Sequence, residues 1–127
     1  MASPKRVFIS YSVDDTATRD LLVERAAKDF DSLAFTSVGT KEPWDEQWKR
    51  TCRARIKDCQ GVIALLSKST NAETGNRWEI ACAVQEGVPI VGVHIHATDK
   101  GEVPPELHGK PVINWGWSGI GCFLSGL

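Results

Sequence analysis

The sequence lacks three features that would each assign it to a common class of protein. It has no excess of one charge, since 15 Lys and Arg stand against 16 Asp and Glu. Its basic residues form no run of the kind that binds phosphates. It also has no apolar stretch near the roughly 20 residues of a membrane span. Neither a nucleic acid nor a membrane is therefore an expected partner.

Signals for secretion and for metal binding are missing as well. The opening stretch MASPKRVFISYS has no apolar signal-peptide core, which favours a cytoplasmic protein. The cysteines form no CxxC pair, so we expect buried, reduced thiols rather than a zinc site. His94 and His96 alternate along an expected strand, but no partner has matching metal-ligand spacing, and no metal is expected. The cysteines are Cys52, Cys59, Cys82 and Cys122.

What the sequence does have is an alternation of apolar strands and helical segments. With 42% hydrophobic and 24% charged residues, residues 1–127 can bury the core of one domain. The alternation predicts a flavodoxin-like three-layer α/β sandwich, a five-stranded parallel sheet with helices on both faces. The polar stretch ATDKGEVPPELHGK is expected to be a surface connection. The expected strands are Arg6–Tyr11, Leu33–Val38, Gly61–Ser67, Pro89–Ile95 and Pro111–Trp115.

Sheets of this kind bind ligands outside the carboxyl ends of their strands, where the strand order switches. Three segments are expected at that edge: Ser10–Asp15, Gly39–Gln47 and Ser67–Glu79. The phosphate-binding motifs GxGxxG and GxxxxGK[ST] are both absent. A site at this edge would therefore be built without either phosphate cradle.

The last of these segments leads into TGNRWEIACAVQEG, residues 74–87, where Glu79 stands between Trp78 and a run of small or apolar residues. One interpretation places Glu79 in the first turn of a helix, where the helix dipole favours a carboxylate. The other is that Glu79 is held there for chemistry. The residue pattern alone favours the first interpretation.

Three stretches resemble the TIR domain superfamily: VFISYSVDD, GVIALLSKST and WEIACAVQEGVPIVGVHI. The likeness runs from Arg6 to about Trp115 and is closest to small bacterial TIR-like proteins, including those of Thoeris-type antiphage systems. It implies the TIR fold. It also implies an NAD glycohydrolase or ADP-ribosyl cyclase, whose linear or cyclic product signals to a downstream effector.

The resemblance implies that Glu79, followed by Ile80, is the catalytic residue. Departure of nicotinamide leaves an oxocarbenium-like ribosyl cation, which a carboxylate stabilises electrostatically, as in glycosidases. NAD is then the substrate and no cofactor is required. The family often has a tryptophan four positions before the glutamate, where this chain has Gly75 and places Trp78 beside Glu79 as a candidate contact.

Other residues at the same edge are candidate substrate contacts. Ser10 and Tyr11 follow the first strand and could line the pocket, with Phe8 as part of its floor. Trp44 could stack on a base, and Asp45 could bind a ribose hydroxyl. The alternative for these last two is the start of the next helix, since Pro and acidic residues favour a first turn.

Structural alternatives also apply to neighbouring residues. Asp14 or Asp15 could cap the helix that follows them, or Asp15 could orient the loop. Trp48 falls on the apolar stripe of its helix, which favours core packing. Trp115 and Trp117 are expected to form a packing pair rather than to contact a ligand.

The alternative function is a non-catalytic scaffold or adaptor that acts through TIR–TIR assembly. A glutamate at position 79, and the absence of a fused receptor, death or coiled-coil domain, disfavour it. Self-association is expected in either case, since the resemblance implies that NAD is held between neighbouring TIR domains. A nucleoside deoxyribosyltransferase is disfavoured, because the nucleoside-binding Asp motifs of that family are not found in this sequence. A receiver domain would need an aspartate where the third strand ends in Leu66 and Ser67.

Overall fold

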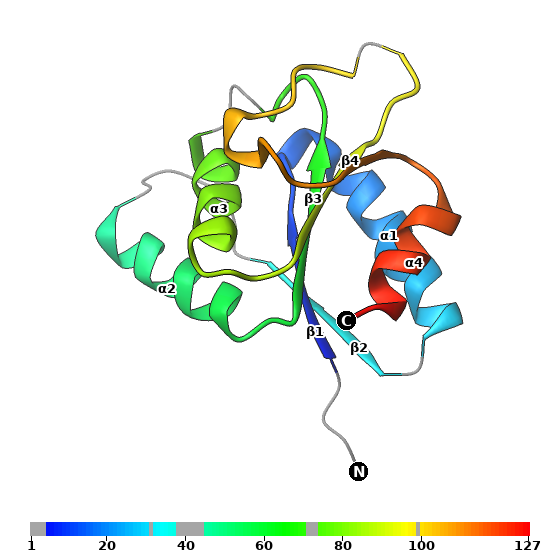
Figure 1. The fold of residues 1–127 in the computed structure, drawn as a ribbon, viewed down its shortest axis with the longest axis horizontal. Helices are drawn as coiled ribbons and strands as arrows, with labels where there is room; N and C mark the ends of the chain where they lie inside the picture. Colours follow the sequence, from blue (N-terminus) through cyan, green and yellow to red (C-terminus); the bar gives the residue numbers. More distant parts are fainter. Residues whose placement is uncertain (1–4, 31, 38–44, 71–73, 99) are drawn as a thin grey trace.

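The computed structural model describes residues 5–30, 32–37, 45–70, 74–98 and 100–127. Within these ranges, strands form one sheet in the order β2-β1-β3-β4-β5, and each neighbouring pair is parallel (Figure 1). The predicted five-stranded flavodoxin-like sheet is therefore confirmed. The strands are β1 Lys5–Ser10, β2 Leu33–Thr36, β3 Gly61–Leu66, β4 Ile90–His94 and β5 Val112–Asn114.

Helices cover both faces of this sheet. In Figure 1, α2 and α3 lie on one side of the strands, and α1 and α4 lie on the other. The helices are α1 Thr16–Asp29, α2 Glu46–Lys57, α3 Thr74–Gln85 and α4 Trp117–Ser125, with short 3-10 helices η1 Val13–Asp15 and η2 Pro105–Leu107.

The central strand β3 explains why the core has two halves. All of its residues, GVIALL, are buried, as expected for a parallel strand covered on both faces. Successive side chains of a strand point to opposite faces. Val62 and Leu66 accordingly join the cluster beneath α2 and α3, whereas Ile63 and Leu65 join the cluster beneath α1 and α4.

The polar stretch after β4 does more than connect two strands along the surface. Within it, η2 inserts Leu107, which is 1% exposed, into the cluster beneath α2 and α3. Glu106 of η2 accepts a hydrogen bond from Arg77 of α3 at 3.0 Å. Most of the described residues of this stretch are exposed, as expected of a surface connection, and Leu107 anchors it to the core.

The final helix forms despite its glycines. A Cβ on Gly119 would lie 2.9 Å from Cδ1 of Ile113 in β5. That atom is the flexible end of a side chain, and it is burial of Ile120 and Leu124 in the cluster beneath α1 and α4 that holds the helix.

Candidate functional site

The carboxyl end of β1 and the helix α3 meet at Glu79. The sequence left open whether this side chain is solvated, and the structure shows that it is only 1% exposed. The hydroxyl of Ser10, the last residue of β1, donates to Oε1 of Glu79 at 2.8 Å. The thiol of Cys52 in α2 donates to Oε2 at 3.7 Å. Three elements thus enclose one carboxyl group at the predicted edge of the sheet.

The first-turn interpretation of Glu79 is therefore wrong. Helix α3 begins at Thr74, and no acidic residue lies in its first turn. The carboxyl group faces the sheet and α2 rather than water. Packing of α3 against two distant segments, and not the helix dipole, decides where this side chain lies.

Burial changes the charge of Glu79. Removal from water raises the pKa of its carboxyl from 4.5 to about 8, and the hydrogen bonds from Ser10 and Cys52 counteract only part of this rise. The Cys52 thiol beside it also has a raised pKa, first through its own burial and then through Glu79. At neutral pH the folded protein thus holds Glu79 mainly as a neutral acid.

Asn76 is a second polar residue of α3 that the sequence reasoning missed. It is fully buried. With its amide oriented to satisfy its neighbours, it donates to the carbonyl of Tyr11 at 2.8 Å and accepts from the amide of Ser12 at 3.0 Å. A polar residue three positions before Glu79 on the same helix was the signal that could have found it.

Phe8 and Tyr11, the other predicted substrate contacts in β1 and the loop after it, lie on opposite faces of the sheet. Phe8 is fully buried in the same cluster as Cys52, beneath α2 and α3. Tyr11 packs against the opposite cluster, with the guanidinium of Arg19 lying 5.0 Å from its ring centroid. The structure therefore brings Ser10 to Glu79, places Phe8 in the core next to it, and directs Tyr11 away from it.

Asp15 links two loops at the carboxyl edge. It is 7% exposed and accepts a hydrogen bond from the hydroxyl of Ser67, which follows β3, at 2.6 Å. Its side chain makes no capping bond to α1, whereas Ser12 accepts from the amide of Asp14 at the start of η1. Of the two open interpretations, loop orientation by Asp15 is the one that these bonds support.

A polar cavity of about 430 Å³ lies beside this link, where the loops after β1, β3 and β4 meet. Glu79 is not among its lining residues. They are Asp14, Asp15, Ser67, Lys68, Ser69, His96 and Thr98.

Trp78 lies between α2 and α3. Its ring meets that of Trp48 edge to face, with centroids 5.4 Å apart. The guanidinium of Arg53 lies 5.4 Å from the Trp78 ring centroid and also pairs with Glu86 at 2.7 Å. Both indoles pack against the core, as the apolar stripe predicted for Trp48. Trp78, predicted as a substrate contact, is thus part of the contact that holds α2 against α3.

The loop before α2 is only partly described. Asp45 is the N-cap of α2, and its carboxylate accepts from the amide of Trp48 at 2.9 Å. This satisfies an otherwise unpaired helix amide, so Asp45 follows the helix-start alternative. Trp44 lies outside the described residues, and its predicted stacking role stays a prediction.

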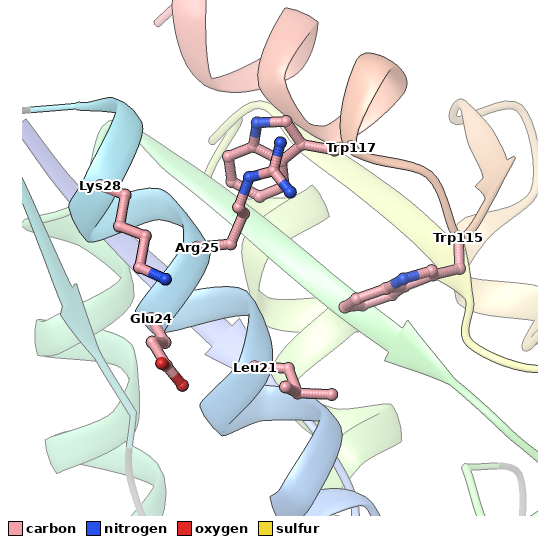
Figure 2. Close-up of a pocket in the computed structure, with 6 residues that line it drawn as sticks. All are labelled: Leu21, Glu24, Arg25, Lys28, Trp115 and Trp117. Atoms are coloured by element: carbon pink, nitrogen blue, oxygen red, sulfur yellow. The ribbon is translucent and has the colours of Figure 1, made fainter.

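The two C-terminal tryptophans do not form the expected packing pair. Among the described residues, the paired aromatic rings are those of Trp48 and Trp78. Figure 2 shows Trp117 against Arg25 and Trp115 on the other side of a cavity of about 320 Å³. Trp117 also donates its indole N–H to Asp29 of α1. Trp117 therefore joins α4 to α1, and Trp115 stays 40% exposed.

The cysteines mostly follow expectation. Cys52, Cys59 and Cys82 are buried and unpaired, whereas Cys122 is unpaired and exposed on α4, which corrects its predicted burial. No group of three or more metal-ligand side chains gathers within the described part of the chain. None of the helices described is long and apolar enough to span a bilayer.

Comparison with known proteins gives one family. A model of the Thoeris protein ThsB, TIR-like domain, matches residues 8–100, which is well over half of the chain. A search of curated proteins finds no match. The matched range includes the end of β1 and all of α2 and α3. Ser10, Cys52, Asn76 and Glu79 lie within it.

Proposed function

The chain belongs to the Thoeris ThsB family of TIR-like domains, and from this premise we propose that it cleaves NAD at the bond between nicotinamide and ribose. Family membership makes it a TIR protein of an antiphage defence system. One observation supports the further step to catalysis. Glu79 is enclosed by hydrogen bonds at the carboxyl edge of the sheet, where α/β proteins bind their ligands.

Cleavage of the bond between nicotinamide and ribose requires an ionised carboxylate in contact with the ribose. Loss of nicotinamide leaves positive charge on the anomeric carbon, and an ionised Glu79 would stabilise that charge electrostatically. A carboxyl group buried from water and bonded on both oxygens meets neither requirement while the domain stays closed. Catalysis therefore needs a rearrangement that exposes Glu79.

Exposure and ionisation of Glu79 would occur together. Burial is the main cause of its raised pKa, so water that reaches the carboxyl group returns the pKa toward 4.5. At neutral pH, the group then changes from a neutral acid to a carboxylate. The contact between α2 and α3, made by Trp48, Trp78 and Arg53, is the boundary that we propose to separate in this step.

Self-association is the proposed cause of this rearrangement. Assembly of neighbouring TIR domains would stabilise the open form, and NAD would bind at the contact between copies. The product, a linear or cyclic ADP-ribose derivative, would signal to a downstream effector of the defence system.

The experiment is incubation of purified protein with NAD over a range of protein concentrations, with products identified by mass spectrometry. The test variant is Glu79→Gln, which keeps size and removes the charge. The matched control is Glu24→Gln, the same change on the exposed side of α1. Product from the parent and the control, but none from Glu79→Gln, supports the proposal. Product from Glu79→Gln at the parent rate excludes Glu79 as the catalytic group.

The alternative function is a non-catalytic scaffold that acts through TIR–TIR contacts. Burial and protonation of Glu79 favour the scaffold, because a buried neutral acid with hydrogen bonds on both oxygens also suits a purely structural role. A scaffold would assemble with concentration and leave NAD intact. Light scattering in parallel with the NAD assay separates the two functions.

A further inference from the structure

Asn76 joins α3 to the connection between β1 and α1. A buried amide is costly unless its donors and acceptors are paired. Asn76 pairs through the carbonyl of Tyr11 and the amide of Ser12, at 2.8 Å and 3.0 Å. Ser12 is itself fully buried, so little water can replace these bonds if they are lost.

Glu79 contacts the same short segment from the same face of α3. Residues three apart on a helix lie on one side of it. Asn76 therefore holds the main chain of Tyr11 and Ser12, while Glu79 accepts from the hydroxyl of the preceding residue, Ser10. Ser10 itself pairs with Ala64 in the ladder between β1 and β3, and Asn76 holds the main chain that directly follows it.

We propose that Asn76 is the positioning residue of the Glu79 site: it holds the connection after β1 so that the Ser10 hydroxyl donates to the Glu79 carboxyl. Its consequence for catalysis rests on the proposed function. The control of the bond between Ser10 and Glu79 by Asn76 is a geometric claim and does not depend on the proposed function.

A general role in stability is the competing explanation, and Thr70 provides the matched control. Thr70 is 1% exposed and lies at the same edge of the sheet, after β3. Its hydroxyl also makes two bonds to main chain, accepting from the amide of Ser67 at 2.9 Å and donating to the carbonyl of Leu65 at 3.3 Å. Neither bond involves Ser10 or Glu79. A purely structural role predicts the same outcome for Asn76→Ala and Thr70→Val.

The experiment follows the titration of the Glu79 carboxyl by carbon NMR in protein with labelled glutamate. The bond from Ser10 lowers the Glu79 pKa, so its loss raises it. Ser10→Ala and Asn76→Ala should both shift the titration upward, by about one pH unit for a hydrogen bond to a charged group. Thr70→Val should leave it unchanged. Cys52, the other titratable partner of Glu79, stays protonated throughout, because burial raises its pKa well above the usual range.

A double variant sharpens the test. If Asn76 acts through Ser10, then Ser10→Ala together with Asn76→Ala shifts the titration no further than Ser10→Ala alone. Additive shifts, or no shift in Asn76→Ala, overturn the proposal. Asn76→Ser, which keeps a hydroxyl for one of the two bonds, carries the same test if Asn76→Ala does not fold, and its shift should be smaller than that of Ser10→Ala.

NAD turnover provides the second measurement. Because the proposed rearrangement breaks the bond from Ser10 to Glu79, Asn76→Ala, which weakens that bond beforehand, should raise NAD turnover at low protein concentration. Thr70→Val should retain the parent kcat. If none of the proteins cleaves NAD, the proposed function fails, while the titration still decides whether Asn76 positions the site.

Discussion

Burial of Glu79 predicts an unusual dependence of stability on pH. In the unfolded chain its carboxyl ionises near 4.5, whereas in the folded protein the pKa is about 8. Between these values the unfolded state has lost the proton and the folded state keeps it. A folded pKa above the unfolded one means that stability is greatest below 4.5 and falls as pH rises toward 8.

The size of the effect follows from the same two values. Each pH unit between them lowers the free energy of unfolding by about 1.4 kcal/mol. From pH 5.5 to pH 7.5, Glu79 alone should therefore reduce stability by about 3 kcal/mol. Glu79→Gln removes the ionisable group and should lose this slope. Relative to the parent, the variant gains about 3 kcal/mol over the same interval.

The assay is urea unfolding at pH 5.5, 6.5 and 7.5, followed by fluorescence of the tryptophans. Equal m-values in parent and variant are needed before the free energies are compared. His94, whose pKa is lowered by burial and by Lys100, titrates in both proteins, so its contribution cancels in the difference. Glu24→Gln serves as the exposed control and should keep the parent slope. A difference between Glu79→Gln and parent that stays constant with pH would refute a neutral, buried Glu79.

Three further predictions concern assembly and packing. Arg53→Ala removes the cation above Trp78 and the ion pair with Glu86, and should lower the free energy of unfolding by about 1 kcal/mol. Because it weakens the contact between α2 and α3, it should also raise NAD turnover at low protein concentration. Arg50→Ala, at an exposed position of α2, is the control. Specific activity should rise with protein concentration in step with light scattering, and constant activity across a monomeric range would exclude a site shared between copies. Gly119→Ala should stabilise the protein by about 0.5–1 kcal/mol in thermal unfolding, because alanine favours the helix and the flexible end of Ile113 can move aside, and a destabilised variant would show that Ile113 cannot move.

The sheet could be predicted from the sequence because its determinants are local. An apolar run such as GVIALL favours a strand buried on both faces, and its flanking polar residues mark its ends. Helical spacing in the segments between such runs predicts the parallel order. Leu107 was missed because isolated apolar residues in a proline-containing stretch show no helical or strand period.

The environment of Glu79 could not be predicted because it is not local. Ser10 lies 69 positions away and Cys52 27 positions away, and only the packing of β1 and α2 against α3 brings them together. The environment of Trp78 is also determined by residues distant in the sequence, although its position beside Glu79 suggested a ligand contact. Trp48 and Arg53 of α2 give it a packing role instead.

The exposure of Cys122 gives the native protein one convenient attachment point. All four cysteines fall within the described ranges, and the other three are buried. Cys122 lies on α4, across the sheet from the helices that enclose Glu79. A maleimide fluorophore should therefore couple at this single thiol without mutagenesis, far from the catalytic candidate. Energy transfer between copies labelled in this way would follow assembly of the unaltered protein in real time.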